Sequence, residues 1–595
     1  MKKLINDVSA VVPEMLAGIA LLNPGLVLLG DGRIAVRADA REPAALGRVA
    51  LVSGGGSGHE PAHAGYVGPG MLSAAVAGEV FTSPSTDAVL EAIRAVAGPE
   101  GVLLIVKSYT GDRLNFGLAA EIARSEGTPV EMVVVAEDVA LSADGPHAGR
   151  RGLAGTVLVH KIAGAAAAEG RSLTEVAELA RGTAARLGTM GVALSPSTVP
   201  AAGKPGFTLA DDEIEFGLGI HGEAGVRRAR MQPADAIVEQ LLDPILADLQ
   251  LSAGSRVALL VNNLGGSAAG ELSIVAGSAV RHLRSRGLVV ERAWAGTFLT
   301  ALEMGGCSLS LLEVDDERLR WLDAPARTTA WPTQQGRVGT ASVRAVPQPS
   351  DVSPDGGGLS RESPLRRAVE AACNRLLAAE PELTELDSQV GDGDLGESLA
   401  RAARSVLAEI DGYPQDSEPG AVLRRMSHTV RRVVGGTSGP LYAVLLLRAA
   451  VSLEESALEE SALEESALEE SALEESALEE SGGADASDWS AALTAAVAGL
   501  QQLGGAQVGD RTMVDAIQPA ATALAKALAA GGKAEQALSA AVAAAEDGTR
   551  ATAHLTARLG RSSYVGDRAL GVVDPGAHAV ALWLAAVRDA LASSG

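Results

Sequence analysis

The chain has 595 residues, of which 47% are hydrophobic but only 3% aromatic, and its formal net charge is −25. This length exceeds what one hydrophobic core supports and predicts roughly two to four domains, while the negative charge argues against nonspecific binding to nucleic acid. The sequence contains no apolar run of about 18 residues without charges, so it predicts no membrane-spanning helix.

The N-terminus begins like a signal peptide, but Asp7, Pro13 and Glu14 interrupt any apolar core and no credible cleavage site follows. Cys307 and Cys373 lie far apart in the sequence among apolar residues, which favours buried free thiols over a disulfide. Together these features predict a cytoplasmic protein that does not bind a membrane.

Residues 1 to about 330 alternate short apolar strands with helical patterns, as an α/β domain does. The expected strands are 49–52, 102–106, 130–135 and 257–261. Three of these four run into loops rich in Gly, Ser, Asn or Asp, where α/β sheets hold ligands. Ser172 followed by Glu175 predicts a capping box that opens a helix through about Leu187.

The first of these loops is the glycine-rich segment 53–63, expected directly after a strand. Its consecutive glycines allow backbone N–H groups to converge on an oxyanion or hydroxyl, and His59 follows them. The segment is not a Walker A sequence, because no Gly-Lys-Ser/Thr follows. A plain turn after a strand remains the alternative.

Two further segments contain candidate catalytic residues. At the end of the second expected strand, Asp112 could take a hydroxyl proton and Lys107 could hold a polar group, although Asp112 could equally cap the following helix. His221 stands between glycines, where a neutral imidazole could add to a carbonyl carbon, although an isolated histidine is more often an ordinary loop residue.

The composition changes to Pro, Gly, Ser and Gln over residues 331–362, which predicts a flexible linker. Residues 363–595 lack a strand pattern and predict an all-α domain. Apolar residues recur there at helical spacing around 365–377, 421–434, 489–503, 515–530 and 534–546.

Residues 453–481 repeat Leu-Glu-Glu-Ser-Ala five times and end in a partial copy. The leucines of a five-residue repeat spiral around a helix and form no single apolar stripe, and Glu455 repels Glu459 one turn later. Twelve of the chain's acidic residues lie here. We expect a solvent-exposed marginal helix or a disordered insertion without a chemical role, in preference to a coiled coil or a binding arm.

Three aspartates, Asp387, Asp392 and Asp394, crowd one glycine-rich turn between expected helices. Such closely spaced carboxylates repel one another unless a cation lies between them, and oxygen ligands suit Mg2+ or Ca2+. Because Mg2+ is usually shared with substrate phosphates, the cluster points to a nucleotide; a solvated acidic turn is the alternative.

The segment 435–440 places glycines and hydroxyls before an apolar helix expected at 441–450, which suits a phosphate. Three weaker segments, 509–515, 560–564 and 574–577, follow. In these, Asp510 and Asp515 could instead cap helices, and Arg561 could be a surface charge.

Taken in order, these motifs resemble the single-chain ATP-dependent dihydroxyacetone kinases, in which a DhaK-type ketose domain precedes a DhaL-type nucleotide domain. The resemblance covers nearly the whole chain apart from the linker and the pentad insertion. It implies an α/β domain over 1–330, a linker over 331–362 and an all-α helical barrel over 363–595.

The resemblance also implies roles in the ketose domain. His221 would bind the keto carbon covalently as a hemiaminal, which distinguishes a ketone from glycerol. His59 and Asp112 would hydrogen-bond the substrate, and one of them would take the proton of the attacking hydroxyl. Lys107 and the loop Gly56, Ser57 and Gly58 would complete the pocket.

In the helical domain, the three aspartates would bind two Mg2+ ions that bridge the phosphates of ATP. The residues implied around the nucleotide are Leu395, Gly396, Glu397, Ser398, Thr437, Ser438, Gly504, Thr512, Met513, Arg561, Asp574, Pro575 and Gly576. The family further implies a small ketose as the partner and a homodimer. The two domains would have to meet during turnover, and the linker is expected to permit this.

Two departures leave the substrate open. Val572-Val573 precedes Asp574 where many relatives have His-Pro, and Ala224 stands where Pro is common. Relatives with this layout phosphorylate erythrulose or similar four-carbon ketoses, and one branch also cyclises FAD. We therefore expect a dihydroxyacetone kinase, with an erythrulose kinase or a noncatalytic carbonyl-binding regulatory protein as alternatives. A phosphotransferase-system type is disfavoured, because its two domains are usually separate chains.

Overall fold

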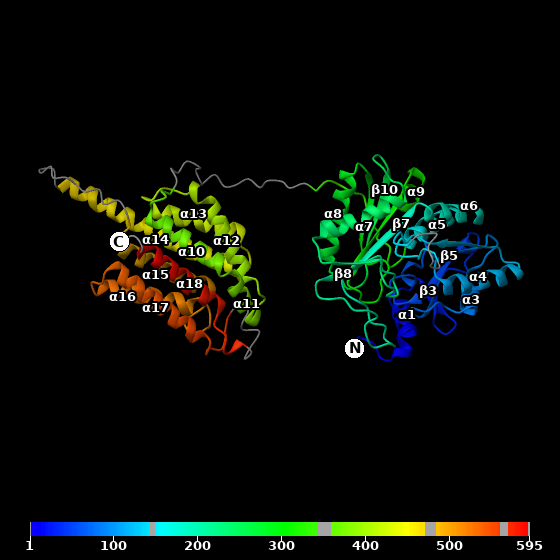
Figure 1. Ribbon diagram of the computed structural model, residues 1–595, viewed down its shortest axis with the longest axis horizontal. Helices are drawn as coiled ribbons and strands as arrows, with labels where there is room; N and C mark the ends of the chain where they lie inside the picture. Colours follow the sequence, from blue (N-terminus) through cyan, green and yellow to red (C-terminus); the bar gives the residue numbers. More distant parts are fainter. Residues whose placement is uncertain (1, 142–148, 342–358, 471–483, 560–568, 593–595) are drawn as a thin grey trace. The chain divides into compact units, whose positions relative to one another are not determined.

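The computed structural model describes residues 2–141, 149–341, 359–470, 484–559 and 569–592. The chain forms two compact units, Met1–Val343 and Arg344–Gly595 (Figure 1). No helix in the described part of the chain is long and apolar enough to cross a membrane.

The first unit is built on two six-stranded sheets within its described residues. One sheet has the order β1-β2-β4-β3-β5-β6, in which β4, β3, β5 and β6 run parallel. Its strands are β1 (Leu26–Leu29), β2 (Ile34–Arg37), β3 (Ala50–Ser57), β4 (Ala74–Val80), β5 (Val102–Lys107) and β6 (Val130–Val135). Every residue of β5 is buried, as in a parallel strand covered on both faces.

The second sheet has the order β11-β10-β12-β7-β8-β9 and is antiparallel except between β10 and β11. Its strands are β7 (Leu187–Ala193), β8 (Glu213–Phe216), β9 (Arg227–Arg230), β10 (Arg256–Asn263), β11 (Val289–Gly296) and β12 (Gly306–Glu313). All four expected strands are present. The remaining strands were not predicted; β7, for example, is interrupted by two glycines, which weaken a strand pattern.

Helices cover these sheets in layers. Helices α3 (Thr86–Val96) and α4 (Thr110–Ser125) pack on one face of the first sheet, and α7 (Ala234–Asp248) and α8 (Ala269–Ser285) on the second. Helix α5 (Thr156–Glu169) shares one apolar core with residues of both sheets, which explains why nearly all its residues are buried. The other helical segments of this unit are η1 (Val8–Ala10), α1 (Val11–Leu22), α2 (Pro43–Leu46), η2 (Ala64–Tyr66), α6 (Leu173–Ala184) and α9 (Asp316–Asp323).

The predicted capping box is present at the start of α6, where Ser172 and Glu175 cap each other. The helix ends at Ala184, earlier than expected, because β7 begins at Leu187. The first residues of the expected linker pack on this unit: Trp331 is buried against Trp294, and Gly336 O accepts a hydrogen bond from Ala293 N at 2.7 Å. Residues 342–358 lie outside the described part, so the division at 331–362 stays a prediction.

The second unit is helical throughout its described residues, as expected, and the predicted helical segments all coincide with helices (Figure 1). The helices described in this unit are α10 (Pro364–Ala378), α11 (Glu380–Val390), α12 (Leu395–Glu409), η3 (Ile410–Gly412), α13 (Pro419–Val433), α14 (Ser438–Glu470), α15 (Ala486–Gly504), α16 (Val514–Ala529), α17 (Ala534–Thr552) and α18 (Pro575–Ala592). Their apolar faces surround a cavity of about 560 Å³.

The first copies of the pentad repeat continue α14. Leu453 is buried and Glu454 pairs with Arg424 of α13, but Leu458 is 70% exposed. The helix continues to Glu470, and the expected solvent exposure is seen for most residues from Glu455 to Ser461; residues 471–481 lie outside the described part.

Candidate functional site

The glycine-rich segment differs from its prediction, because Gly54 to Ser57 belong to β3 itself and not to a loop after it. The glycines allow the strand to continue, because neighbouring backbone approaches them too closely to leave room for a side chain. A Cβ on Gly54 would lie 2.3 Å from Val76 O, and one on Gly56 would lie 2.6 Å from Thr82 N. Side chains are therefore excluded here, and the strand carries its bare backbone to the edge of the site.

Lys107 and Asp112 lie beside the same strand. A Cβ on Gly55 would be 2.8 Å from Lys107 Nζ and 3.4 Å from Asp112 Oδ2. Both side chains are buried, Lys107 as the last residue of β5 and Asp112 in the first turn of α4. Burial lowers the pKa of Lys107, and nearby carboxylates, Asp112 foremost, oppose that shift.

Asp112 does not cap α4, because the N-cap residue is Tyr109 and no side chain accepts a capping bond there. Its Oδ1 is buried without a hydrogen-bond partner among the described residues. A buried carboxylate oxygen without a donor is costly in a protein interior. Of the two interpretations of Asp112, this geometry favours an acceptor for a hydroxyl group over a helix cap.

His59 is completely buried directly after β3. Its Nδ1 lies 2.8 Å from Thr300 O and its Nε2 3.1 Å from His221 Nε2, while its ring stacks on Phe81 with centroids 5.2 Å apart. Burial lowers the pKa of His59 well below its usual value, and the charges of His221 and Lys107 add to this effect.

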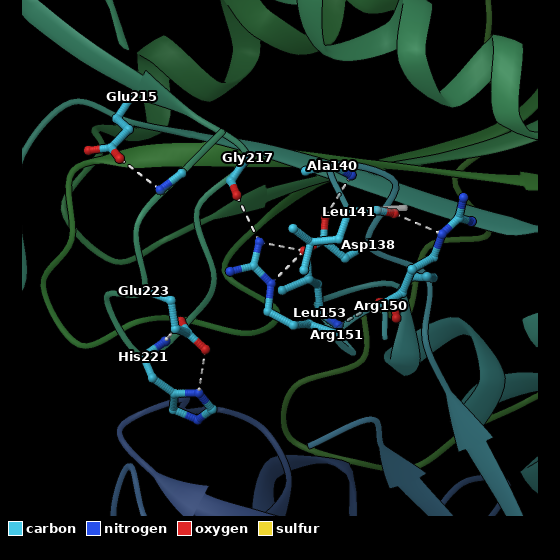
Figure 2. A network of polar contacts seen from close by, with 12 residues as sticks. Asp138, Ala140, Leu141, Arg150, Arg151, Leu153, Glu215, Gly217, His221 and Glu223 are labelled. Carbon is cyan, nitrogen blue, oxygen red and sulfur yellow. Dashed lines mark hydrogen bonds and ion pairs between the residues drawn. The ribbon is translucent and has the colours of Figure 1, made fainter. Parts of the chain in front are cut away.

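His221 comes from the distant loop after β8, where it lies beside Glu223 (Figure 2), and its ring contacts that of His59. Its Nδ1 lies 3.2 Å from Glu223 Oε1, and its backbone N donates to Glu223 Oε2 at 2.9 Å. The ring is enclosed edge-on by Phe81 and Tyr109, with centroids 5.2 and 4.6 Å away, yet 21% of its side chain stays exposed. A small molecule can therefore reach it.

Glu223 is a functional candidate that the sequence analysis missed. Burial disfavours its ionisation, but the hydrogen bonds and charge of His221 outweigh burial and lower the pKa of Glu223 to about 2. The only sequence signal was an acid two positions after a histidine, which is common in loops.

A buried ion pair supports the loop of His221 (Figure 2). Arg151 donates to Asp138 Oδ2 at 2.7 Å and to Gly217 O at 2.8 Å. A Cβ on Gly219 would lie 2.6 Å from Arg151 Nη1 and 2.1 Å from Glu223 Oε2, so the loop closes tightly over both groups. Nothing local in the sequence marked Asp138 or Arg151.

The hydrogen bonds of the two rings fix their protons. His59 Nδ1 must donate to the carbonyl of Thr300, and His221 Nδ1 must donate to the carboxylate of Glu223. With both Nδ1 atoms protonated, the two Nε2 atoms can share one additional proton, which gives the pair a single positive charge. Ionised Glu223 balances that charge.

In the helical unit, the aspartate trio lies where α11 meets α12. One carboxylate oxygen from each of Asp387, Asp392 and Asp394 lies within 4.8 Å of the others, with Asp387 partly buried and the other two exposed. Asp387 Oδ2 accepts from Leu395 N at 3.2 Å, and Gly393 adopts a φ of +76°. An all-oxygen set at the N-terminus of a helix fits Mg2+ together with phosphate oxygens.

Most of the residues expected around the nucleotide lie at or directly before helix starts. Leu395 to Ser398 open α12, Thr437 and Ser438 open α14, and Thr512 and Met513 precede α16. A Cβ on Gly576, at the start of α18, would lie 3.4 Å from Met513 Cβ, and His578 Nε2 lies 2.8 Å from Glu382 Oε1 of α11. The starts of α16 and α18 are thus adjacent, and α18 contacts the helix that carries Asp387.

Gly504 ends α15 and lies beside Leu441 of α14, where a Cβ on the glycine would be 3.4 Å from Leu441 Cδ2. Asp574 is buried before α18, where its Oδ1 accepts from Ala577 N at 2.8 Å, and burial raises its pKa to about 6. Pro575 begins that helix. Arg561 lies outside the described residues.

Family models match both units: the Dak1 domain over residues 17–330 and the DAK2 domain over residues 389–589. The triokinase/FMN cyclase of Homo sapiens is 43% identical over 100% of both chains, and the D-erythrulose kinase of Mycolicibacterium smegmatis is 35% identical over 100% of this chain and 99% of its own. The crystal structure of the dihydroxyacetone kinase from C. freundii with AMP-PNP and Mg2+ is 35% identical, covers 99% of both chains and has a TM-score of 0.61. The chain therefore belongs to the dihydroxyacetone kinase family, with a Dak1 and a DAK2 domain in one polypeptide.

Proposed function

We propose that the chain transfers a phosphoryl group from ATP to the terminal hydroxyl of a short-chain ketose, with dihydroxyacetone as the preferred acceptor. The observation that carries this proposal is the contact between His221 and His59, with Glu223 on the other nitrogen of His221. A protonated imidazole pair with a fixed counterion is suited to a carbonyl group. The family membership supports the same chemistry.

His221 Nε2 attacks the keto carbon and forms a carbon–nitrogen bond as the carbonyl π bond breaks. The proton that His221 Nε2 shares with His59 moves to the carbonyl oxygen, so the product is a hemiaminal hydroxyl. The positive charge stays on the substituted imidazole, next to Glu223, and the charge of the site does not change. Glycerol has no carbonyl and cannot be held in this way.

Tethering fixes the terminal hydroxyl for attack and offsets part of the entropy of orienting a small substrate. Asp112, with its unpartnered buried Oδ1, accepts the proton of that hydroxyl, and His59 is the second candidate base. Lys107 holds a substrate oxygen against the bare backbone of Gly56, Ser57 and Gly58. A ketose is small enough to be enclosed by these groups alone.

Asp387, Asp392 and Asp394 hold Mg2+, for which we propose two ions, and the helix starts at Gly396, Ser438 and Met513 surround the nucleotide. When bound, Mg2+ neutralises charge on the phosphates during transfer. The backbone N–H groups at the start of α12 add fixed positive dipoles to the same place. The C. freundii relative was crystallised with AMP-PNP and Mg2+, which supports this assignment.

Erythrulose is the second candidate acceptor, because the M. smegmatis relative is a D-erythrulose kinase that matches along the whole chain. Its keto carbon and the terminal hydroxyl on the adjacent carbon stand in the same relation as those of dihydroxyacetone. We further propose a homodimer located in the cytoplasm, which suits the two buried free cysteines.

The test is a coupled assay of ADP release with dihydroxyacetone, both erythrulose enantiomers, glyceraldehyde and glycerol. We expect the highest kcat/KM for dihydroxyacetone and no turnover of glycerol. A higher value for one erythrulose enantiomer would reassign the acceptor. Equal turnover of glycerol, or no ADP release with any ketose, would refute the proposed chemistry.

A further inference from the structure

Behind the ketose site, Lys107 is hydrogen-bonded to a series of two buried histidines that the proposed mechanism does not use. Lys107 Nζ lies 2.9 Å from His63 Nε2, and His63 Nδ1 lies 3.0 Å from His160 Nε2. The three residues come from β5, the segment after β3, and α5. All are buried, and His160 is completely so.

The donor and acceptor of each hydrogen bond in this three-residue series can be assigned by starting from Lys107. An ammonium only donates, so His63 Nε2 must accept from Lys107, which leaves the proton of neutral His63 on Nδ1. That proton is donated to His160 Nε2, and the proton of His160 is then on its own Nδ1. His160 Nδ1 has no partner among the described residues, so the chain ends there.

The surroundings of both imidazoles favour the neutral form, in which Nε2 accepts a hydrogen bond and Nδ1 carries the proton. Burial, followed by the charge of Lys107, lowers the pKa of His63 well below its usual value and that of His160 to about 3. A proton cannot therefore be passed from Lys107 through His63 and left on His160 at neutral pH. The two histidines therefore orient the ammonium of Lys107 and leave its proton there; they do not transfer that proton onward.

The other charged groups around Lys107 are carboxylates from three different elements: Asp112 of α4, Glu137 after β6 and Glu60 after β3. They favour the ammonium by charge, but none makes a hydrogen bond to Nζ within the part of the chain that the structure describes. His63 is thus the group that fixes where Nζ lies, and the remaining N–H bonds are left for a ligand and Asp112.

We propose that His63 and His160 are positioning residues, which hold the ammonium of Lys107 in the ketose pocket and keep it protonated. This inference rests on the proposed function for the role of Lys107, but the geometry of the three side chains does not depend on it. It predicts that loss of His63 weakens ketose binding and makes activity more sensitive to alkaline pH, although His63 touches no substrate.

The kinetic test compares His63→Phe, His63→Gln and His160→Phe in the full chain. The amide oxygen of Gln takes the place of Nε2 and accepts from Lys107, whereas Phe fills the space without an acceptor. Loss of a hydrogen bond to a charged group corresponds to about a 10- to 100-fold change. For His63→Phe we expect the ketose KM to rise by this factor and the alkaline limb of kcat/KM to shift down by about one to two pH units. For His160→Phe we expect both effects to be smaller.

His63→Gln should restore KM to within about threefold of the parent chain, and the KM for ATP should be unchanged in all variants. His554→Gln, an exposed histidine of the helical unit, serves as the matched control. Equal losses for His63→Gln and His63→Phe would show a packing role and overturn the inference. So would a parental KM and pH profile for His63→Phe.

A second measurement does not require kinase activity. The chain is labelled with ring-15N histidine, and the nitrogen shifts of His63 and His160 are assigned from their absence in the two Phe variants. We expect a protonated Nδ1 and an unprotonated Nε2 on both rings. A protonated Nε2 on His63 would overturn the inference even in an active kinase, whereas failure to phosphorylate any ketose would leave this result standing and refute only the proposed function.

Discussion

Replacing Glu223 by Gln tests whether a fixed negative charge prepares His221 for the ketone. The amide oxygen can still accept from His221 N, but the charge that balances the imidazole pair is lost. The pKa of Glu223 falls from 4.5 to about 2, and each unit corresponds to about 1.4 kcal/mol, or roughly 3.4 kcal/mol in all. Because 36% of the side chain is exposed, solvent screening reduces this to about 1.5 kcal/mol.

That free energy corresponds to about a tenfold lower kcat/KM for the ketose, with the KM for ATP unchanged. Glu213→Gln is the matched control, since Glu213 pairs with Arg228 near the same loop and contacts neither histidine. The assay is the coupled release of ADP under saturating ATP. A kcat/KM for Glu223→Gln equal to that of the control would refute the reasoning.

The same carboxylate predicts a stability effect with a definite sign. Because its pKa is lower in the folded chain than the ordinary 4.5, its contribution to the free energy of unfolding is complete above pH 4.5 and is lost as the pH falls towards 2. Urea unfolding of the parent chain should therefore lose more stability over this interval than Glu223→Gln does. If the free energy of unfolding had the same pH dependence in the parent chain and in Glu223→Gln, the ion pair between Glu223 and His221 would be contradicted.

Three predictions concern the helical unit. Asp392→Asn should abolish turnover with Mg-ATP and weaken Mg-dependent nucleotide binding by calorimetry; normal activity would remove the metal assignment. Gly396→Ala should lower the free energy of unfolding by about 1–3 kcal/mol in urea, because its Cβ would lie 2.2 Å from Thr384 Oγ1. Gly270→Ala, whose Cβ meets nothing within 4 Å, should cost nothing, and equal effects would contradict the steric account. Burial raises the pKa of Asp574 from 3.8 to about 6, so the free energy of unfolding should fall by up to about 3 kcal/mol as the pH rises through that interval. Asp574→Asn should lack this decline. An unchanged decline in the variant would show that another group causes it.

Local patterns were sufficient to predict both fold classes. Strands β5 and β10 contain buried apolar runs, β6 is apolar apart from Glu131, and the helices of the second unit show regular apolar spacing. Strands such as β4 and β7, which each contain several Ala and Gly residues, were not predicted, because their pairing with neighbouring strands contributes more than their own side chains.

The candidate site divides in the same way. His59, Asp112 and the aspartate trio stand in short glycine-rich segments and could be selected from the sequence. Arg151 and His160 could not, because each acts through a partner distant in the sequence and lies in a segment without a local pattern. The contact between His59 and His221, 162 positions apart, follows only from the topology that brings the two sheets together.

The most direct test of the account is the chemical state of the bound ketose. The full chain is titrated with dihydroxyacetone labelled with 13C at the keto carbon, in the absence of nucleotide, and followed by 13C NMR. The account predicts a new resonance of a tetrahedral carbon bonded to nitrogen and oxygen, which saturates at one per chain and is absent in His221→Gln. Only free ketone and hydrate resonances from an active parent chain, or the same new resonance in His221→Gln, would contradict it.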